Sequence, residues 1–129
     1  MILVDTSAWI EVLRGRARDR YAEAVAGEEV VTCLPVMQEV LQGIDDDRAF
    51  HLAAAAFVDI PILENPLTRD VFDEAVRLYR DARRAAITIR SSVDCLIAAC
   101  ALRNDAMILH VDRDFTHLAR ISGLRARQL

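Results

Sequence analysis

The chain has 129 residues, which suits one compact domain and is too short for two. Hydrophobic residues make up 53% and charged residues 28%, a globular composition that argues against a disordered, collagen-like or low-complexity chain. The 16 basic and 20 acidic residues give a net charge of -4, so no overall positive field draws the chain onto nucleic acid or an anionic membrane, and any nucleic-acid binding must be local.

The inventory of reactive side chains excludes several chemistries. All 16 basic residues are arginine, which rules out Schiff bases, P-loop phosphate binding and receiver-domain switches, because each needs a lysine. Cys33, Cys95 and Cys100 form no CxxC pair and the histidines form no HExxH pattern, so we expect reduced core cysteines and no zinc site. No apolar run approaches the ~20 residues of a membrane span, and no signal-peptide pattern is present, so we expect a cytoplasmic protein.

The first half of the chain alternates short apolar segments with helical patterns. Residues 1–4 are apolar and residues 30–33 are β-branched, so each segment predicts a buried strand. A polar turn, Asp5-Thr6-Ser7, separates the first strand from the next helix. Helical patterns cover the segment with Trp9, Ile10 and Leu13 and residues 17–26, 35–42 and 48–59.

The second half predicts an amphipathic helix followed by a buried one. Because Pro61 lacks an N–H, residues 60–63 suit only a short edge strand. Thr68 is expected to cap an amphipathic helix that extends to Ala82. Eight consecutive apolar residues at 95–102 predict a helix in the centre of the domain. A strand at residues 107–111 and a short helix at residues 115–121 complete the pattern.

Strands that alternate with helices imply an α/β fold, in which helices cover both faces of a parallel sheet. Ligands in such folds bind beyond the carboxyl ends of the strands. Carboxylates stand at these ends: Asp5 follows the first strand, Glu39 lies in the helix after the second, Asp94 opens the central helix and Asp112 follows the last strand. We expect these four side chains, which come from distant parts of the sequence, to converge on one edge of the sheet.

Each carboxylate also has an ordinary structural explanation. Asp5 suits the N-cap of the helix behind it, and Asp94 fits a capping box with the serine three residues before it. Glu39 points away from the apolar face of its helix, as a solvated side chain does. Asp112 and Asp114 both suit a turn or an N-cap, and Asp114 is the better cap for a helix that opens one residue later.

A cluster of these carboxylates needs a compensating cation. Two bare carboxylates about 4 Å apart repel by roughly 4 kcal/mol at an effective dielectric constant near 20. Oxygen ligands without a histidine or thiolate pattern favour a hard ion, Mg²⁺ or Mn²⁺. Such an ion suits phosphodiester hydrolysis without a covalent nucleophile. Thr6 and Ser7 are supporting candidates, with hydroxyls that can hydrogen-bond water or a phosphate oxygen, although capping is the commoner use of such residues.

Three segments resemble the signatures of PIN-domain proteins, specifically the VapC-type toxins of bacterial toxin–antitoxin pairs. They are residues 1–10 (MILVDTSAWI), 88–99 (TIRSSVDCLIAA) and 110–115 (HVDRDF). Their order and separations match, and the resemblance covers the chain from end to end. It implies a single PIN domain over residues 1–129, with a three-layer fold in which helices flank a short central parallel sheet.

The resemblance also implies an activity and partners. These are Mg²⁺-dependent endoribonuclease activity on structured RNA such as transfer or ribosomal RNA, and a homodimer that a VapB-type antitoxin holds inactive. The catalytic residues that it implies are Asp5, Glu39, Asp94 and Asp112. The metal ligands that it implies are Asp5, Asp94, Asp112 and Asp114. Glu39 is included because the segment QEVLQG resembles the family's glutamate-bearing helix, despite the helical periodicity that turns Glu39 away from the core.

Arginines flank the predicted site. Five of them are candidates for contacts with RNA phosphates. They are Arg14, Arg16, Arg83, Arg84 and Arg90. Solvation, or pairing with Asp19, Glu23 and Asp81, is at least as good an explanation of these arginines. Because aromatic residues make up only 5% of the chain, recognition should depend on RNA shape more than on base stacking.

Other classes that gather acids at strand ends fit less well. A receiver domain needs a lysine after its last strand, and the chain has none. A haloacid-dehalogenase-type phosphatase needs Asp-x-Asp, whereas Asp5 is followed two residues later by Ser7. The remaining alternative is a catalytically inactive PIN-like module that binds RNA or protein.

Overall fold

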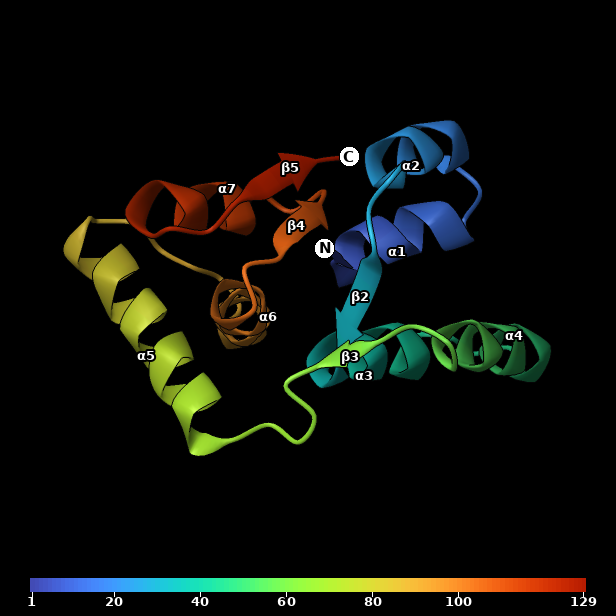
Figure 1. The fold of residues 1–129 in the computed structure, drawn as a ribbon, viewed down its shortest axis with the longest axis horizontal. Helices are drawn as coiled ribbons and strands as arrows, with labels where there is room; N and C mark the ends of the chain where they lie inside the picture. Colours follow the sequence, from blue (N-terminus) through green and yellow to red (C-terminus); the bar gives the residue numbers. More distant parts are fainter.

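The structure is a computed structural model that describes residues 1–129. Five strands and seven helices alternate along the chain (Figure 1). The strands are β1 (Ile2–Val4), β2 (Val30–Cys33), β3 (Ile62–Leu63), β4 (Met107–His110) and β5 (Ala126–Gln128). The helices are α1 (Thr6–Leu13), α2 (Arg18–Val25), α3 (Leu34–Gln42), α4 (Asp47–Phe57), α5 (Arg69–Arg84), α6 (Ser92–Arg103) and α7 (Arg113–Ile121). None of these helices is long and apolar enough to cross a membrane.

The strands form one parallel sheet in the order β3-β2-β1-β4-β5. β1 lies in the middle, where Leu3 is in register with Val31 of β2 on one side and with Ile108 of β4 on the other. The predicted α/β fold with a short parallel sheet is therefore confirmed. Because β1 and β4 are neighbours and run in the same direction, the residues that follow them meet at one edge of the sheet.

Alternate residues of β1 enter two separate cores. Leu3 belongs to the larger core, which α3, α5, α6 and α7 help to build. Ile2 and Val4 point the other way and pack with Ala8 of α1 and Leu109 of β4. Figure 1 shows α5 and α6 on one side of the sheet and α1 and α2 on the other. The helices therefore form two outer layers around the sheet, and the apolar α6 lies inside the larger core as expected.

The structure differs from the expected elements in several details. β5 pairs with β4 although Ala126-Arg127-Gln128 contains no β-branched or aromatic residue, because its backbone completes the edge of the sheet. β4 ends at His110, one residue before the expected end. Thr68 lies at the N-cap of α5 as expected, but its side chain makes no capping hydrogen bond.

The central position of α6 predicts a large effect of Ile97→Ala, because Ile97 is fully buried in the larger core and its truncation leaves a cavity. The free energy of unfolding, measured by urea denaturation, should fall by about 2–5 kcal/mol. Leu52→Ala on the exposed face of α4 is the control and should change this free energy by less than about 0.5 kcal/mol. Equal effects of the two substitutions would contradict the buried position of α6.

Candidate functional site

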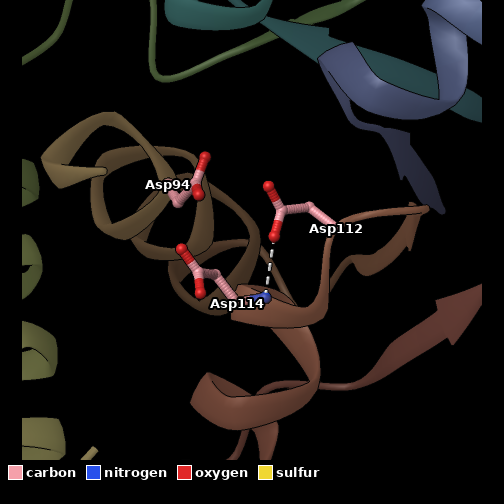
Figure 2. Close-up of side chains that lie close together, drawn as sticks. All are labelled: Asp94, Asp112 and Asp114. Atoms are coloured by element: carbon pink, nitrogen blue, oxygen red, sulfur yellow. Dashed lines mark hydrogen bonds between the residues drawn. The ribbon is translucent and has the colours of Figure 1, made fainter. Parts of the chain in front are cut away.

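Three aspartates from two distant segments form a compact cluster. Asp94 lies in the first turn of α6, while Asp112 follows β4 and Asp114 lies in the first turn of α7. Each offers a carboxylate oxygen, and these oxygens all lie within 4.8 Å of one another. Figure 2 shows the three side chains facing a common space between α6 and the turn after β4. Three carboxylates at this spacing have the composition and separation of ligands for a hard divalent cation.

Asp5 lies next to this cluster at the end of β1, where its backbone N–H donates to the carbonyl of Leu109 (2.9 Å). Only 3% of Asp5 is exposed. Its Oδ2 accepts from the Ser7 backbone N–H (3.0 Å) and the Ser7 hydroxyl (2.6 Å), whereas its Oδ1 is buried and has no partner. A buried carboxylate oxygen without a donor is costly, and a bound cation removes this cost. The donor set of Asp5, Asp94, Asp112 and Asp114 therefore fits a Mg²⁺-type ion.

Glu39 approaches the same region from α3. The Thr6 hydroxyl donates to Glu39 Oε1 (2.9 Å), which directs the carboxylate toward the start of α1. Glu39 is half-buried, and this hydrogen bond holds its carboxylate against α1 although the helical periodicity turns it away from the core. Burial is the main cause of the raised pKa of Asp5 and of Asp94, and the charge of Glu39 adds a smaller contribution to both.

Asp94 has the most strongly raised pKa among the acids of this site. Burial, followed by the charges of Asp5, Asp112, Asp114 and Glu39, raises the pKa of Asp94 from 3.8 to about 8. Burial also raises the pKa of Asp5, against the hydrogen bonds from Ser7 and with a contribution from Glu39. Desolvation and mutual repulsion thus both disfavour the charged carboxylates, and a cation at their centre reverses both effects.

Arg90 supplies part of the compensating charge. Its Nη2 lies 2.6 Å from Asp112 Oδ1, and its Nε lies 3.5 Å from Asp114 Oδ1. The backbone N–H of Arg90 also donates to Asp114 Oδ2 (3.0 Å). Pairing of Arg90 with the site aspartates is not among the expectations from the sequence, because residue 90 is 22 and 24 positions away from its partners.

Comparison with known proteins identifies the family of the chain. A model of the PIN domain family matches residues 2–121. The chain is 40% identical over 131 aligned residues to ribonuclease VapC11 of Mycobacterium tuberculosis and to VapC ribonuclease Mb1587 of Mycobacterium bovis, with 98% of this chain and 97% of each relative covered. This chain belongs to the PIN domain family. The resemblance to VapC-type PIN domains, expected from three segments of the sequence, is confirmed.

The fold of this PIN domain also matches solved structures. VapBC2 from Rickettsia felis, solved with a DNA fragment from its promoter, aligns with a TM-score of 0.78 at 16% sequence identity, and the match covers 99% of this chain and 98% of that one. At this identity the likeness concerns the fold alone.

Two site aspartates of this PIN domain are also helix caps. Asp5 caps α1 through the Ser7 N–H, and Asp112 caps α7 through the Asp114 N–H. The expectation that Asp114 is the better cap is wrong, because α7 begins at Arg113 and Asp114 lies inside its first turn. The capping box between Ser91 and Asp94 is absent, since Ser91 makes no side-chain capping bond. Capping and metal binding are compatible, because a cap uses one carboxylate oxygen and leaves the other.

The other candidate arginines of the PIN domain have local partners. Arg16 pairs with Glu11 (2.6 Å). Arg84 pairs with Asp81 (3.5 Å), one of the partners that the sequence suggests. Arg83 lies over the Tyr79 ring, 5.1 Å from its centroid. Arg14 is exposed at the end of α1. These positions leave Arg90 as the candidate that directly contacts the acidic cluster.

A polar cleft of about 460 Å³ opens beside the cluster. Its lining residues come from α1, from the segment before α6 and from the turn after β4. They are Ser7, Ile10, Glu11, Arg90, Val111, Asp112 and Arg113. Arg113, which is exposed at the start of α7, is absent from the arginines selected from the sequence, although its position between Asp112 and Asp114 was a usable signal.

The raised pKa of Asp94 predicts how stability depends on pH when divalent ions are chelated. Between the unfolded pKa of 3.8 and the folded pKa of about 8, the folded state binds more protons than the unfolded state. The free energy of unfolding should therefore fall as pH rises through this window. Asp94→Asn removes this titration, so its free energy of unfolding should fall less over the same window.

Urea denaturation in EDTA at a series of pH values measures this difference. Asp105→Asn serves as the control, because Asp105 is 94% exposed and lies at the opposite edge of the sheet, before β4. Its backbone has a positive φ of 49°, which asparagine also tolerates. Asp105→Asn should follow the wild-type profile. Parallel profiles for wild type and Asp94→Asn would overturn the raised pKa.

Proposed function

We propose that this chain is a Mg²⁺-dependent endoribonuclease toxin of a VapBC-type toxin–antitoxin pair, acting on structured RNA such as transfer or ribosomal RNA in the cytoplasm. The observation that carries the proposal is the cluster of Asp94, Asp112 and Asp114 beside the partnerless oxygen of Asp5. Two relatives that are 40% identical over nearly their whole length are named as ribonucleases, which supports the same activity here. Oxygen-only ligands favour Mg²⁺, with Mn²⁺ as the alternative ion.

The side chains of the site have separate tasks in this proposal. Asp5, Asp94, Asp112 and Asp114 would hold the ion. When bound, Mg²⁺ supplies activation of water and neutralises negative charge on the phosphoryl group and the leaving oxygen. Ser7 keeps the Asp5 carboxylate oriented through its two hydrogen bonds to Oδ2, which leaves the buried Oδ1 without a protein partner and available to an ion.

Glu39 is the residue best placed to handle a proton. Its Oε1 accepts from the Thr6 hydroxyl, so its second oxygen remains available for a hydrogen bond from the attacking water. Thr6 and Ser7 thus act by orienting carboxylates on either side of the start of α1. This assigns them a positioning role rather than direct contact with a phosphate.

Substitution of the proposed ligands provides the direct test. Asp5→Asn and Asp94→Asn each keep side-chain volume and remove a negative ligand, so Mg²⁺-dependent cleavage of purified transfer and ribosomal RNA should fall by at least about hundredfold. Asp105→Asn, at the opposite edge of the sheet, should retain full activity. Undiminished cleavage by either ligand variant, or cleavage by wild type in EDTA, would reject the mechanism. Wild type that binds RNA without cleaving it would favour the inactive PIN-like module.

We also propose a VapB-type antitoxin as partner and a homodimer as the state of the toxin. The antitoxin partner is supported by solved structures with the same fold, which include a toxin–antitoxin complex from Klebsiella pneumoniae and VapBC-1 from Haemophilus influenzae.

The homodimer is supported by apolar surface on α5. Phe72 and Val76 are exposed there and line an apolar groove of about 490 Å³ between α5 and α6. Exposed apolar surface of this kind is typical of protein interfaces.

The charge pattern of α5 favours a second copy of this chain as the occupant of the groove. Acidic side chains prevail in its first half and basic ones in its second half. The first half has the acidic residues Asp70, Asp73 and Glu74 and one basic residue, Arg69, whereas the second half has the basic residues Arg77, Arg80, Arg83 and Arg84 and one acidic residue, Asp81. A two-fold axis that packs α5 antiparallel against its copy would set each acidic half against a basic half.

Val76→Asp tests this interface. A charge at the centre of the apolar groove should convert a dimer into a monomer, which size-exclusion chromatography with light scattering detects. Val58→Asp, at a still more exposed valine that follows α4, should leave the mass unchanged. A wild-type monomer, or a dimer that survives Val76→Asp, would remove this interface.

A further inference from the structure

Arg90 contacts two of the carboxylates that would hold a divalent cation. The guanidinium contacts Asp112 Oδ1 and Asp114 Oδ1, and both carboxylates belong to the three-aspartate cluster. A guanidinium on these carboxylates neutralises part of their charge and repels a second cation placed beside it, so Arg90 weakens the attraction of Asp112 and Asp114 for Mg²⁺ or Mn²⁺. The two cations therefore disfavour each other at this site.

The Arg90 side chain is free to leave while its backbone stays. The side chain is 54% exposed, whereas that of Asp114 is 2% exposed, so the guanidinium lies at the mouth of the site and the carboxylate on its floor. The backbone N–H of Arg90 holds Asp114 Oδ2 independently of the guanidinium. The neighbouring Ile89 is buried in the larger core and anchors the segment.

The cleft beside the cluster offers a second position for the guanidinium. Arg90 and Arg113 line it together with the outer side of Asp112. An RNA phosphate in this cleft would meet two arginines next to the metal ligands. Arginine binds phosphate through the same planar fork that it uses for carboxylates, so the exchange of partners needs only side-chain rotation.

We propose that Arg90 is a tethered competitor of the divalent cation, and that an RNA phosphate in the cleft takes over its guanidinium when the cation binds. The inference rests on the proposed function, because it takes the acidic cluster as the metal site. Its consequence is positive coupling. The phosphate withdraws Arg90 from Asp112 and Asp114, which strengthens metal binding, and by linkage the metal strengthens RNA binding to the same degree.

The first measurement is Mn²⁺ binding without RNA, by titration calorimetry or by loss of the free Mn²⁺ signal in electron paramagnetic resonance. Arg90→Gln should bind Mn²⁺ about tenfold more tightly than wild type, the equivalent of one charge-assisted pair. Arg90→Lys keeps the positive charge but loses the planar guanidinium, so its affinity for Mn²⁺ should lie between those of wild type and Arg90→Gln. Arg125→Gln is the matched control, since Arg125 is 53% exposed and pairs only with Asp105, far from the cluster. It should leave the affinity unchanged.

The second measurement is the salt dependence of binding of a phosphorothioate-linked oligoribonucleotide, which resists hydrolysis. In saturating Mn²⁺, the slope of log affinity against log salt should be smaller in Arg90→Gln than in Arg125→Gln by about one phosphate contact. Without Mn²⁺ the two slopes should agree, because Arg90 is then engaged by Asp112 and Asp114.

The outcomes separate this inference from the proposed function. Mn²⁺ binding that is unchanged or weaker in Arg90→Gln would overturn the competition and leave the metal site intact, since Arg90 would then merely position the carboxylates. Equal salt slopes in saturating Mn²⁺, or no oligonucleotide binding, would overturn the transfer to phosphate. Absence of Mn²⁺ binding in all variants would reject the metal site itself, and both proposals with it.

Discussion

Repulsion between carboxylates held at the carboxyl ends of β1 and β4 is the interaction on which the rest of the site depends. The parallel register places Asp5 and Asp112 at the same edge, and α6 brings Asp94 to them from the larger core. Burial prevents water from screening these charges, which is why the pKa of Asp94 rises to about 8. The fold thus maintains a strained electrostatic state that a divalent cation relieves. In the proposed function, this repulsion is the source of the affinity of the site for a divalent cation.

The N-termini of three helices offset part of the repulsion between these carboxylates. α1 begins after Asp5, α6 contains Asp94 in its first turn, and α7 begins after Asp112 and contains Asp114 in its first turn. Each helix N-terminus carries a partial positive charge and unsatisfied N–H groups, both of which favour a carboxylate. The same residues therefore serve local structure and the site. Capping and function are not competing explanations in this chain.

Arginine completes the balance of charge. The chain is acidic overall, yet Arg90 places a guanidinium against two of the clustered aspartates, and Arg113 lies beside the same cleft. A protein of net charge -4 can approach RNA only where positive charge is concentrated. In the function proposed here, Arg90 concentrates this positive charge beside the aspartates that would hold the cation, and one side chain would link phosphate binding to metal binding.

The sequence by itself determined the alternation of strands and helices, the buried α6, and the four carboxylates, because periodicity and residue type are local properties. The tertiary structure alone decided three further points. Glu39 faces the site despite its helical periodicity, since α3 packs beside α1, where Thr6 donates to it. β5 exists because β4 offers an unpaired edge, although its own residues do not favour a strand. Arg90 meets Asp112 and Asp114 only through the packing of α6 and α7, and no pattern along the chain encodes a contact between residues so far apart.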